Sequence, residues 1–193
     1  MVAATKYTED QILDAAATLI ADAGLESVSV AAIARMVGAP SGSIYHRFAS
    51  RKHLLGALWV RTTSLYAASL ADTLKTSDLA DLAGSIVNHT FDWVEAHPRE
   101  ATLLMRLRTE DFDAKDWPAE VVEAITNVNA ALVETIVAVA IEHQIDPIDM
   151  TLAAIDVPAS IARRSILLGD RALDSRLRHR ATELVAHLLS ATP

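Results

Sequence analysis

The chain has 193 residues, of which 51% are hydrophobic and 5% aromatic, and its formal net charge is -8 at pH 7. This apolar content predicts a globular protein with a substantial core and excludes a disordered chain. The lack of cysteine excludes disulfides and thiolate chemistry. Residues 1–10 lack the pattern of a secretory signal, and no run approaches the roughly 20 apolar residues of a membrane span, so we expect a cytoplasmic protein with no membrane partner.

Apolar residues recur at helical spacing and no stretch alternates as a strand does, which predicts an all-α protein of about nine helices. Thr8 and Gln11 have the spacing of a capping box before an apolar stripe that ends at Gly24. Ser29 is the expected N-cap of a short helix that stops at Gly38. The next helix starts after Pro40, because proline suits the first positions of a helix.

Further along, Ser50 is the expected cap of a long helix, and capping, proline and glycine residues bound the helices that follow it. Their approximate ranges are 78–96, 98–108, 118–141, 147–169 and 174–189. The fourth of these is predicted to end at Gly169 and to be kinked by Pro158, because proline lacks the backbone N–H that the helix needs. An acidic loop is expected between Glu110 and Asp116.

The stretch from Ser27 to Ala71 carries no Asp or Glu, although the chain as a whole is acidic. Its five basic residues are Arg35, Arg47, Arg51, Lys52 and Arg61. A helix, a glycine turn and a second helix lie within this stretch. A positive helix-turn-helix on an acidic protein predicts a surface directed at DNA phosphates.

The N-terminal part resembles the TetR family of bacterial transcription regulators. The matching segments are 25–30, 33–34, 37–39, 42–48, 50–52 and 54–55. The resemblance implies a three-helix DNA-binding domain over residues 1–52 and a larger helical ligand-binding and dimerisation domain over residues 53–193. Pro40, where Ser or Thr is common, and Arg51, where Lys is usual, depart from the family pattern.

The residues expected at DNA are Ser29, Ser41, Gly42, Ser43, Tyr45, His46, Arg51 and Lys52. The start of the second motif helix enters the major groove, where Gly42 would let the backbone approach closely. The serine side chains discriminate bases poorly, so DNA shape or water would supply much of the specificity. Arg51 and Lys52 start the next helix, where cations and backbone N–H groups favour a phosphate.

Each of these residues also has a purely structural interpretation. Tyr45 could pack on its own domain, His46 could be a solvated surface residue, and Ser29 caps its helix in either case. Arg47 is as consistent with an internal contact as with DNA, and Arg35 is better explained as structural.

The resemblance also implies a homodimer that binds a pseudo-palindromic, double-stranded operator. We place the dimer interface on the last two helices, at Ala159, Ala162, Leu177, Leu184 and Leu188. Small residues allow close helix approach and the leucines form an apolar stripe, although the same residues could instead close the core of one protomer.

Residues that interrupt apolar stripes are the candidates for binding a small, largely apolar effector. They are Trp59, His89, Trp93, Met105, Arg106, Trp117 and Asn129, and each could instead belong to the core or the surface. The expected function is that of a repressor released from its operator by this effector. A ligand-independent or activating DNA-binding regulator is the alternative, and a helical small-molecule-binding protein or an enzyme is less favoured.

No nucleophile and base are spaced for catalysis, so no enzyme, cofactor or metal site is predicted. The acidic loop could suggest a cation, but it lacks the glycine and the terminal glutamate of a calcium-binding loop.

Overall fold

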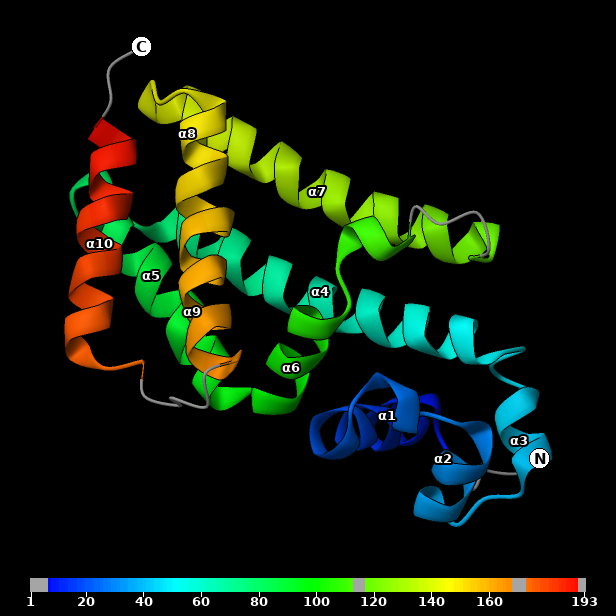
Figure 1. Cartoon of the computed structure of the whole chain (residues 1–193). Coiled ribbons are helices and arrows are strands. Elements are labelled where there is room, and N and C mark those ends of the chain that lie inside the picture. The colour runs from blue at the N-terminus through cyan, green and yellow to red at the C-terminus, as the bar shows by residue number, and fades with distance from the viewer. Residues whose placement is uncertain (1–6, 113–116, 168–172, 191–193) are drawn as a thin grey trace. The chain divides into compact units, whose positions relative to one another are not determined.

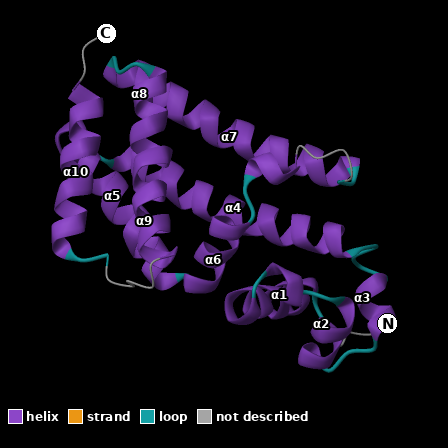
Figure 2. Ribbon diagram, in the orientation of Figure 1, coloured by secondary structure: helices purple, strands orange, loops and turns teal. Residues whose placement is uncertain are grey.

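The chain is helical throughout the residues that the structure, a computed structural model, describes: 7–112, 117–167 and 173–190 (Figure 1). Figure 2 shows helices joined by short loops and no strand in these ranges. Helices α8 (Pro147–Thr151), η3 (Leu152–Asp156) and α9 (Val157–Leu167) follow one another without a gap, so the described residues form nine separate helices. The all-α prediction is confirmed. The predicted helix end at Gly169 and the acidic residues Asp113 and Asp116 lie outside the described ranges.

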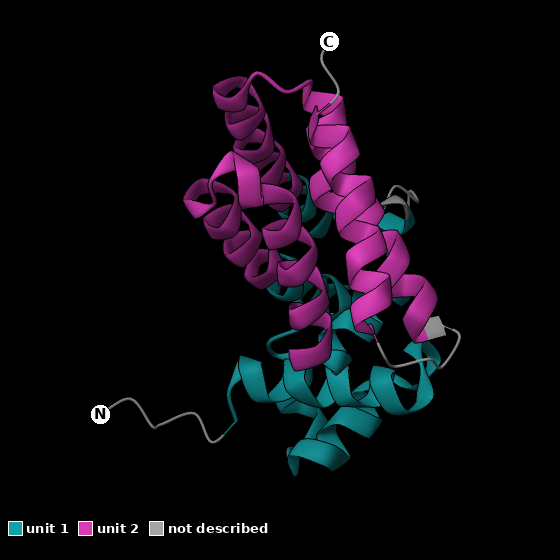
Figure 3. Cartoon of the chain, turned by 90° about the vertical axis from the view of Figure 1, so that its left-hand side faces the viewer, with its two compact units in different colours: residues 1–63, 98–126 teal, residues 64–97, 127–193 magenta. Residues whose placement is uncertain are grey.

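The helices group into two compact units (Figure 3). Unit 1 comprises Met1–Thr63 and Pro98–Thr126, and unit 2 comprises Ser64–His97 and Asn127–Pro193. Helices α4 (Arg51–Thr76) and α7 (Ala119–His143) each begin in unit 1 and continue into unit 2. The two units are defined by how compactly their residues pack. The assignment of DNA binding to residues 1–52, and of ligand binding and dimerisation to residues 53–193, stays a prediction.

Unit 1 starts with α1 (Glu9–Ala23), which the predicted capping box opens. Thr8 Oγ1 accepts a hydrogen bond from the Gln11 backbone N–H at 3.2 Å, and Gln11 Oε1 accepts one from the Thr8 N–H at 3.0 Å. Gly24 ends the helix with φ of 83°, a conformation that favours glycine. The buried face of α1 packs against α6 (Pro98–Arg106), α2 (Val30–Val37) and the short turn η1 (Leu25–Ser27).

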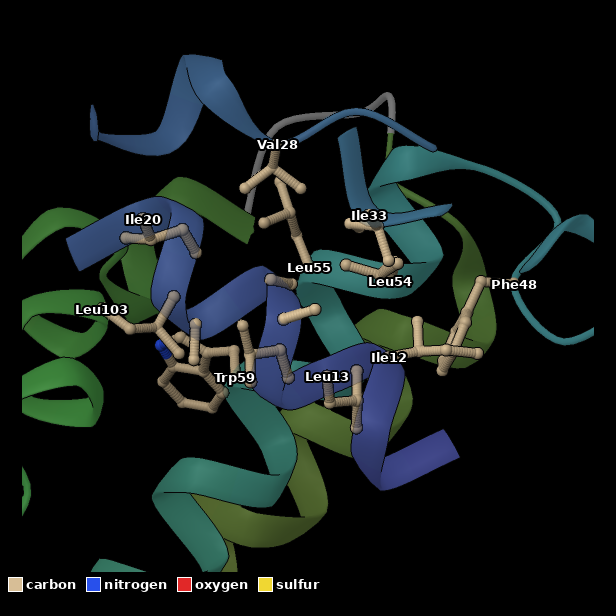
Figure 4. Packing of buried hydrophobic residues seen from close by; sticks show 14 of the residues in the cluster. Ile12, Leu13, Ile20, Val28, Ile33, Phe48, Leu54, Leu55, Trp59 and Leu103 are labelled. Atoms are coloured by element: carbon tan, nitrogen blue, oxygen red, sulfur yellow. The ribbon is translucent and has the colours of Figure 1, made fainter. Parts of the chain in front are cut away.

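The core of unit 1 draws on both of its chain segments (Figure 4). The labelled residues are Ile12, Leu13, Ile20, Val28, Ile33, Phe48, Leu54, Leu55, Trp59 and Leu103. Trp59 is 3% exposed, and its indole N–H donates to the Leu107 carbonyl oxygen at 3.0 Å, so its one polar atom is satisfied inside the core. Val121 and Ile125 of α7 belong to the same cluster. The helices that would face DNA are therefore held by side chains from far along the chain.

Unit 2 holds α5 (Leu79–Ala96), the run α8–η3–α9 and α10 (Ser175–Ser190). Helix α10 packs against α5, α9 and η3, and α5 also packs against α9. Asp146 caps α8 (Pro147–Thr151), with Pro147 in the first turn. The turn η3 (Leu152–Asp156) is π-helical and is followed directly by α9 (Val157–Leu167), which contains Pro158. The predicted irregularity at Pro158 thus takes the form of a widened turn before the proline, where its ring would crowd the preceding carbonyl groups.

Among the described helices, α7 alone is long and apolar enough by composition to cross a membrane. Its most apolar 18-residue window has a mean hydropathy of 1.7, and 28% of that window is buried. The helix buries Val121 and Ile125 in unit 1, and Leu132, Ile136 and Val139 in unit 2. Core helices often have this composition, so the expectation of no membrane partner stays a prediction.

Candidate nucleic-acid interface

The helix-turn-helix is formed by α2 and α3 (Ser41–Tyr45), and its turn is fixed at both ends. Ser29 caps α2, accepting from the Ala32 N–H at 3.2 Å, as predicted. Gly38 ends α2 in the left-handed conformation, with φ of 72°, where a side chain would be strained. The Tyr7 hydroxyl donates to the Gly38 carbonyl oxygen at 2.7 Å, which ties the chain before α1 to this turn.

Burial separates the two faces of α3. Ile44 is fully buried and anchors the helix in the core of unit 1, with Phe48 just beyond it. Tyr45 on the other face is 56% exposed. His46, Ser41 and Gly42 are also exposed, and Ser43 is half-buried. The structure therefore brings the first residues of α3 and the Tyr45–His46 pair together on one accessible side of the motif.

Gly42 has no structural reason to be glycine. A Cβ atom built on it meets no atom within 4 Å, and its φ is outside the left-handed region. Alanine is intrinsically more favourable than glycine in a helix by about 1 kcal/mol. The fold thus leaves room for a side chain at the point where the sequence predicts the closest approach to DNA.

Arg51 is bound within unit 1 more tightly than the sequence indicates. Its Nε donates to the Val28 carbonyl oxygen at 2.9 Å, and its Nη2 donates to the Leu25 carbonyl oxygen at 2.6 Å. Glu26 lies 3.9 Å from Nη2, but its side chain is 98% exposed, so the charge is poorly neutralised. Arg51 therefore joins the start of α4 to the segment before α2, and direct contact with a phosphate stays a prediction.

The start of α4 is organised by Ser50. Its hydroxyl accepts from the His53 backbone N–H at 3.3 Å and lies 2.8 Å from His53 Nδ1, which agrees with the predicted cap. The next residue after Arg51, Lys52, is half-buried, and its ammonium group lies 5.5 Å from the centre of the Trp117 ring.

One of the five basic residues in the acid-free stretch is neutralised within unit 1. Arg61 lies 2.7 Å from Asp14 Oδ1 and 3.3 Å from Asp10 Oδ1. Arg47 instead donates to the Ser43 carbonyl oxygen at 3.0 Å. This contact agrees with the interpretation that Arg47 bonds within its own chain. Attraction of phosphates by the basic residues of this stretch stays a prediction.

Comparison with known proteins agrees with this geometry. Residues 12–58 match the family model described as bacterial regulatory proteins, tetR family. The N-terminal domain belongs to the tetR family. No curated protein sequence matches the chain significantly.

Solved structures extend the likeness over nearly the whole chain. The fatty acid degradation regulator FadR from Bacillus halodurans is 18% identical, covers 96% of this chain and 100% of its own, and superposes with a TM-score of 0.72. FadR from Bacillus subtilis, in complex with stearoyl-CoA, is 15% identical, with coverages of 95% and 98% and a TM-score of 0.73. The multidrug binding protein EbrR, complexed with imidazole, is 22% identical, with coverages of 94% and 89% and a TM-score of 0.67. The chain has the fold of a tetR-family transcription regulator.

The effector candidates divide between the two units. Trp59, Met105, Arg106 and Trp117 lie in unit 1, whereas His89, Trp93 and Asn129 lie in unit 2. The rings of Trp59 and Trp117 lie 5.2 and 4.5 Å from that of Phe112, and the Trp117 N–H donates to the Asp111 carbonyl oxygen at 2.9 Å. These two tryptophans thus form an aromatic cluster of unit 1, and their role in ligand binding stays a prediction.

His89 and Trp93 line an open groove of about 640 Å³ between α4 and α5, most of whose lining residues are of polar type. The ring of Tyr66 lies 5.3 Å from the His89 ring and 5.1 Å from the Trp93 ring. The Ser69 hydroxyl donates to the Tyr66 carbonyl oxygen at 3.0 Å and lies 2.9 Å from His89 Nε2, so Nε2–H donates to Ser69. Burial lowers the pKa of His89, and the charge of Asp92, which raises that pKa, offsets only part of this effect. The neutral imidazole with its proton on Nε2 is therefore favoured.

A second, apolar groove of about 250 Å³ lies between α4 and α7 within unit 2. Its lining residues are Ser64, Ala67, Ala68, Ala71, Val128, Ala131, Leu132 and Thr135. Asn129 is adjacent along α7 but does not line it. The small side chains of α4 create this space, and sequence analysis missed it because alanines at helical spacing are equally typical of tight packing.

The predicted dimer residues differ in exposure within one protomer. Leu184 on α10 is 56% exposed, Leu177 and Leu188 are half-buried, and Ala159 on α9 is half-buried. Ala162 is fully buried, so it packs inside its own protomer. The exposed and half-buried members remain available for a second copy, and the interface itself stays a prediction.

Proposed function

We propose that the chain is a cytoplasmic transcription regulator that binds a pseudo-palindromic operator as a homodimer. The observation that carries the proposal is the exposed start of α3, where Gly42 occupies a position that the fold would allow a larger residue to fill. A bare backbone at this point permits a close approach to base edges in the major groove. Ser41 and Ser43 would hydrogen-bond there, with Tyr45, His46, Lys52 and Ser29 at phosphates.

Recognition by such short side chains supplies little direct discrimination between bases. Serine hydroxyls both donate and accept, so they tolerate several base edges. We therefore expect much of the specificity to come from sequence-dependent DNA shape and bridging water. Two copies of α3 on successive half-sites would provide the affinity that one five-residue helix lacks, and the exposed Leu184 face is the proposed contact between protomers.

We further propose that the regulator is a repressor released by a small, largely apolar effector. The groove between α4 and α7 fits such a molecule because six of its eight lining residues are Ala, Val or Leu. The proteins of the same fold that were determined with stearoyl-CoA and with imidazole show that ligands of very different size occur among the structural relatives. Ligand binding would favour a conformation whose two α3 helices no longer match successive grooves.

The test begins with selection of bound sequences from a random DNA duplex pool, followed by salt-titrated gel shifts. We expect a palindromic site, and a log affinity that falls with log salt by about 0.9 per phosphate contact. Tyr45→Ala and Gly42→Val should lose binding with an unchanged thermal melt. Gly84→Ala in α5, where an added Cβ also meets no atom within 4 Å, is the matched control that should bind normally. Equal binding of selected and random DNA would contradict the proposal.

An activating or ligand-independent regulator is the second candidate, because it would use the same DNA-binding residues. Transcription measured from the selected site, with and without the protein, separates the two: repression supports the first proposal and stimulation the second. Among the described residues, no group of three or more His, Asp or Glu is placed to hold a metal ion.

A further inference from the structure

Gly56 of α4 lies directly against Val121 of α7 within unit 1. A Cβ atom built on Gly56 would overlap Val121 Cγ1 and would lie 3.1 Å from its Cγ2 and 3.3 Å from its Cβ. Carbon atoms in contact normally lie about 3.5–4.0 Å apart. Gly56 is also a helical residue without positive φ, so its backbone conformation does not require glycine. The close crossing of the two helices is the reason that only glycine fits here.

Polar contacts beside this crossing fix its register. His53 lies one turn before Gly56, and Glu120 is the residue before Val121. The Nε2 atom of His53 lies 2.8 Å from Oε1 of Glu120. The other imidazole nitrogen of His53 lies 2.8 Å from the Ser50 hydroxyl that caps α4. A hydrogen bond from the backbone of Glu120 itself lowers the pKa of its carboxyl group most, and the hydrogen bond with His53 and the charge of that imidazole lower it further. The first turn of α7 is therefore bonded to the first turn of α4.

The crossing is continuous with the core that holds the helix-turn-helix. Val121 packs in one cluster with Leu54 and Leu58 of α4, and the same cluster contains Ile33 of α2 and Ile44 of α3. A change in how α7 lies on α4 would therefore be transmitted through side chains that position α3, since packed cores respond to sub-ångström shifts as a unit.

We propose that Gly56 and Val121 are positioning residues for operator recognition. By letting α7 lie directly on the backbone of α4, they set the direction in which α4 continues from the DNA-binding helices, and so the half-site spacing that a dimer can span. This inference rests on the proposed function, because it concerns how an operator is read.

The test compares Gly56→Ala, Val121→Ala and the double variant in operator selection from duplexes whose half-sites are separated by random spacers. The added methyl group of Gly56→Ala pushes α7 away, and operator affinity should fall by about tenfold to a hundredfold at the wild-type spacing. The preferred spacing should change. The double variant removes both Val121 Cγ atoms, so wild-type spacing should return with an affinity within about threefold of the wild type.

Gly84→Ala is the matched control, because it makes the same change in a helix with open space around it. It should bind as the wild type does. Sedimentation and thermal melts verify that each variant is a folded dimer; should Gly56→Ala fail to fold, Val121→Ala alone loosens the crossing and should accept a wider range of spacings than the wild type.

Unchanged spacing preference in Gly56→Ala and Val121→Ala would overturn the inference, as would an affinity loss that is equal at all spacings and persists in the double variant. Both results leave the proposed function intact, because the wild type still selects an operator. A wild-type protein that selects no sequence would remove the proposed function and this inference with it.

Discussion

Two arginine side chains, one in each compact unit, are held mainly by different kinds of partner. In unit 1, Arg51 donates to two backbone carbonyl oxygens at 2.6 and 2.9 Å. In unit 2, Arg178 lies 2.7 Å from Asp92 Oδ1 and 3.1 Å from Glu95 Oε2, with its guanidinium 5.4 Å from the centre of the Phe91 ring. A carbonyl oxygen fixes a guanidinium without cancelling its charge, whereas a carboxylate does both. Arg51 thus supplies structural bonds to unit 1 without losing its charge to a carboxylate.

The largest effect on operator affinity is expected when a carboxylate is placed in the acid-free stretch of unit 1. Ser41→Asp puts one at the first residue of α3, where the helix dipole favours a negative charge, so the melting temperature should not fall. Operator affinity should drop by about a hundredfold through repulsion from phosphates and loss of the hydroxyl. Ser175→Asp makes the same change at the first residue of α10 and should bind normally in the gel shift. Equal losses in both variants would show that the effect is not local.

Removing the carbonyl-bound cation is expected to affect both folding and binding. Arg51→Met leaves two half-buried carbonyl oxygens without their donor, which should lower the free energy of unfolding by about 2 kcal/mol in urea titrations. Arg51→Lys retains the charge but lacks the planar fork, so it should lose most of that stability while keeping the salt dependence of operator binding. An Arg51→Lys variant as stable as the wild type would contradict the structural role assigned to the paired carbonyl bonds.

The smallest effect is expected at Arg178, because its partners are 67% and 47% exposed and solvent screens the pairs. Arg178→Met should lower the free energy of unfolding by about 1 kcal/mol at low salt, and by less at 1 M salt, where screening shortens the reach of the charges. Operator affinity should be unchanged if the variant remains dimeric. A larger loss of unfolding free energy in Arg178→Met than in Arg51→Met would contradict the proposed difference between the two arginines.

Local signals predicted much of the fold because they act over a few residues. The capping box at Thr8, the N-cap at Ser29 and the turn at Gly38 were all readable from residue type and spacing, and the structure confirms each. The expected helices at 78–96 and 174–189 agree within a residue with Leu79–Ala96 and Ser175–Ser190. The TetR-like pattern likewise identified the residues that α3 exposes.

Contacts between distant segments could not be predicted in this way. The two carbonyl partners of Arg51 lie 23 and 26 residues away along the chain, and Trp59 meets the Leu107 carbonyl group 48 residues on. Gly56 has no local signal at all, since its need for glycine arises from Val121. The predicted effector residues were chosen as polar or aromatic interruptions of apolar stripes, a criterion that cannot tell a cavity wall from a satisfied core residue.

The composite core of unit 1 restricts how the DNA-binding region can be exchanged between proteins. A chimera joined after residue 52 would take α1 to α3 away from Leu54, Trp59, Leu103 and Val121, all of which bury their side chains in the same cluster. Functional grafts would have to carry the segments 1–63 and 98–126 together, as two insertions in one recipient chain. Recombination at a single crossover is therefore a poor route to new operator specificity in this protein, whereas point substitution on the exposed side of α3 leaves the core untouched.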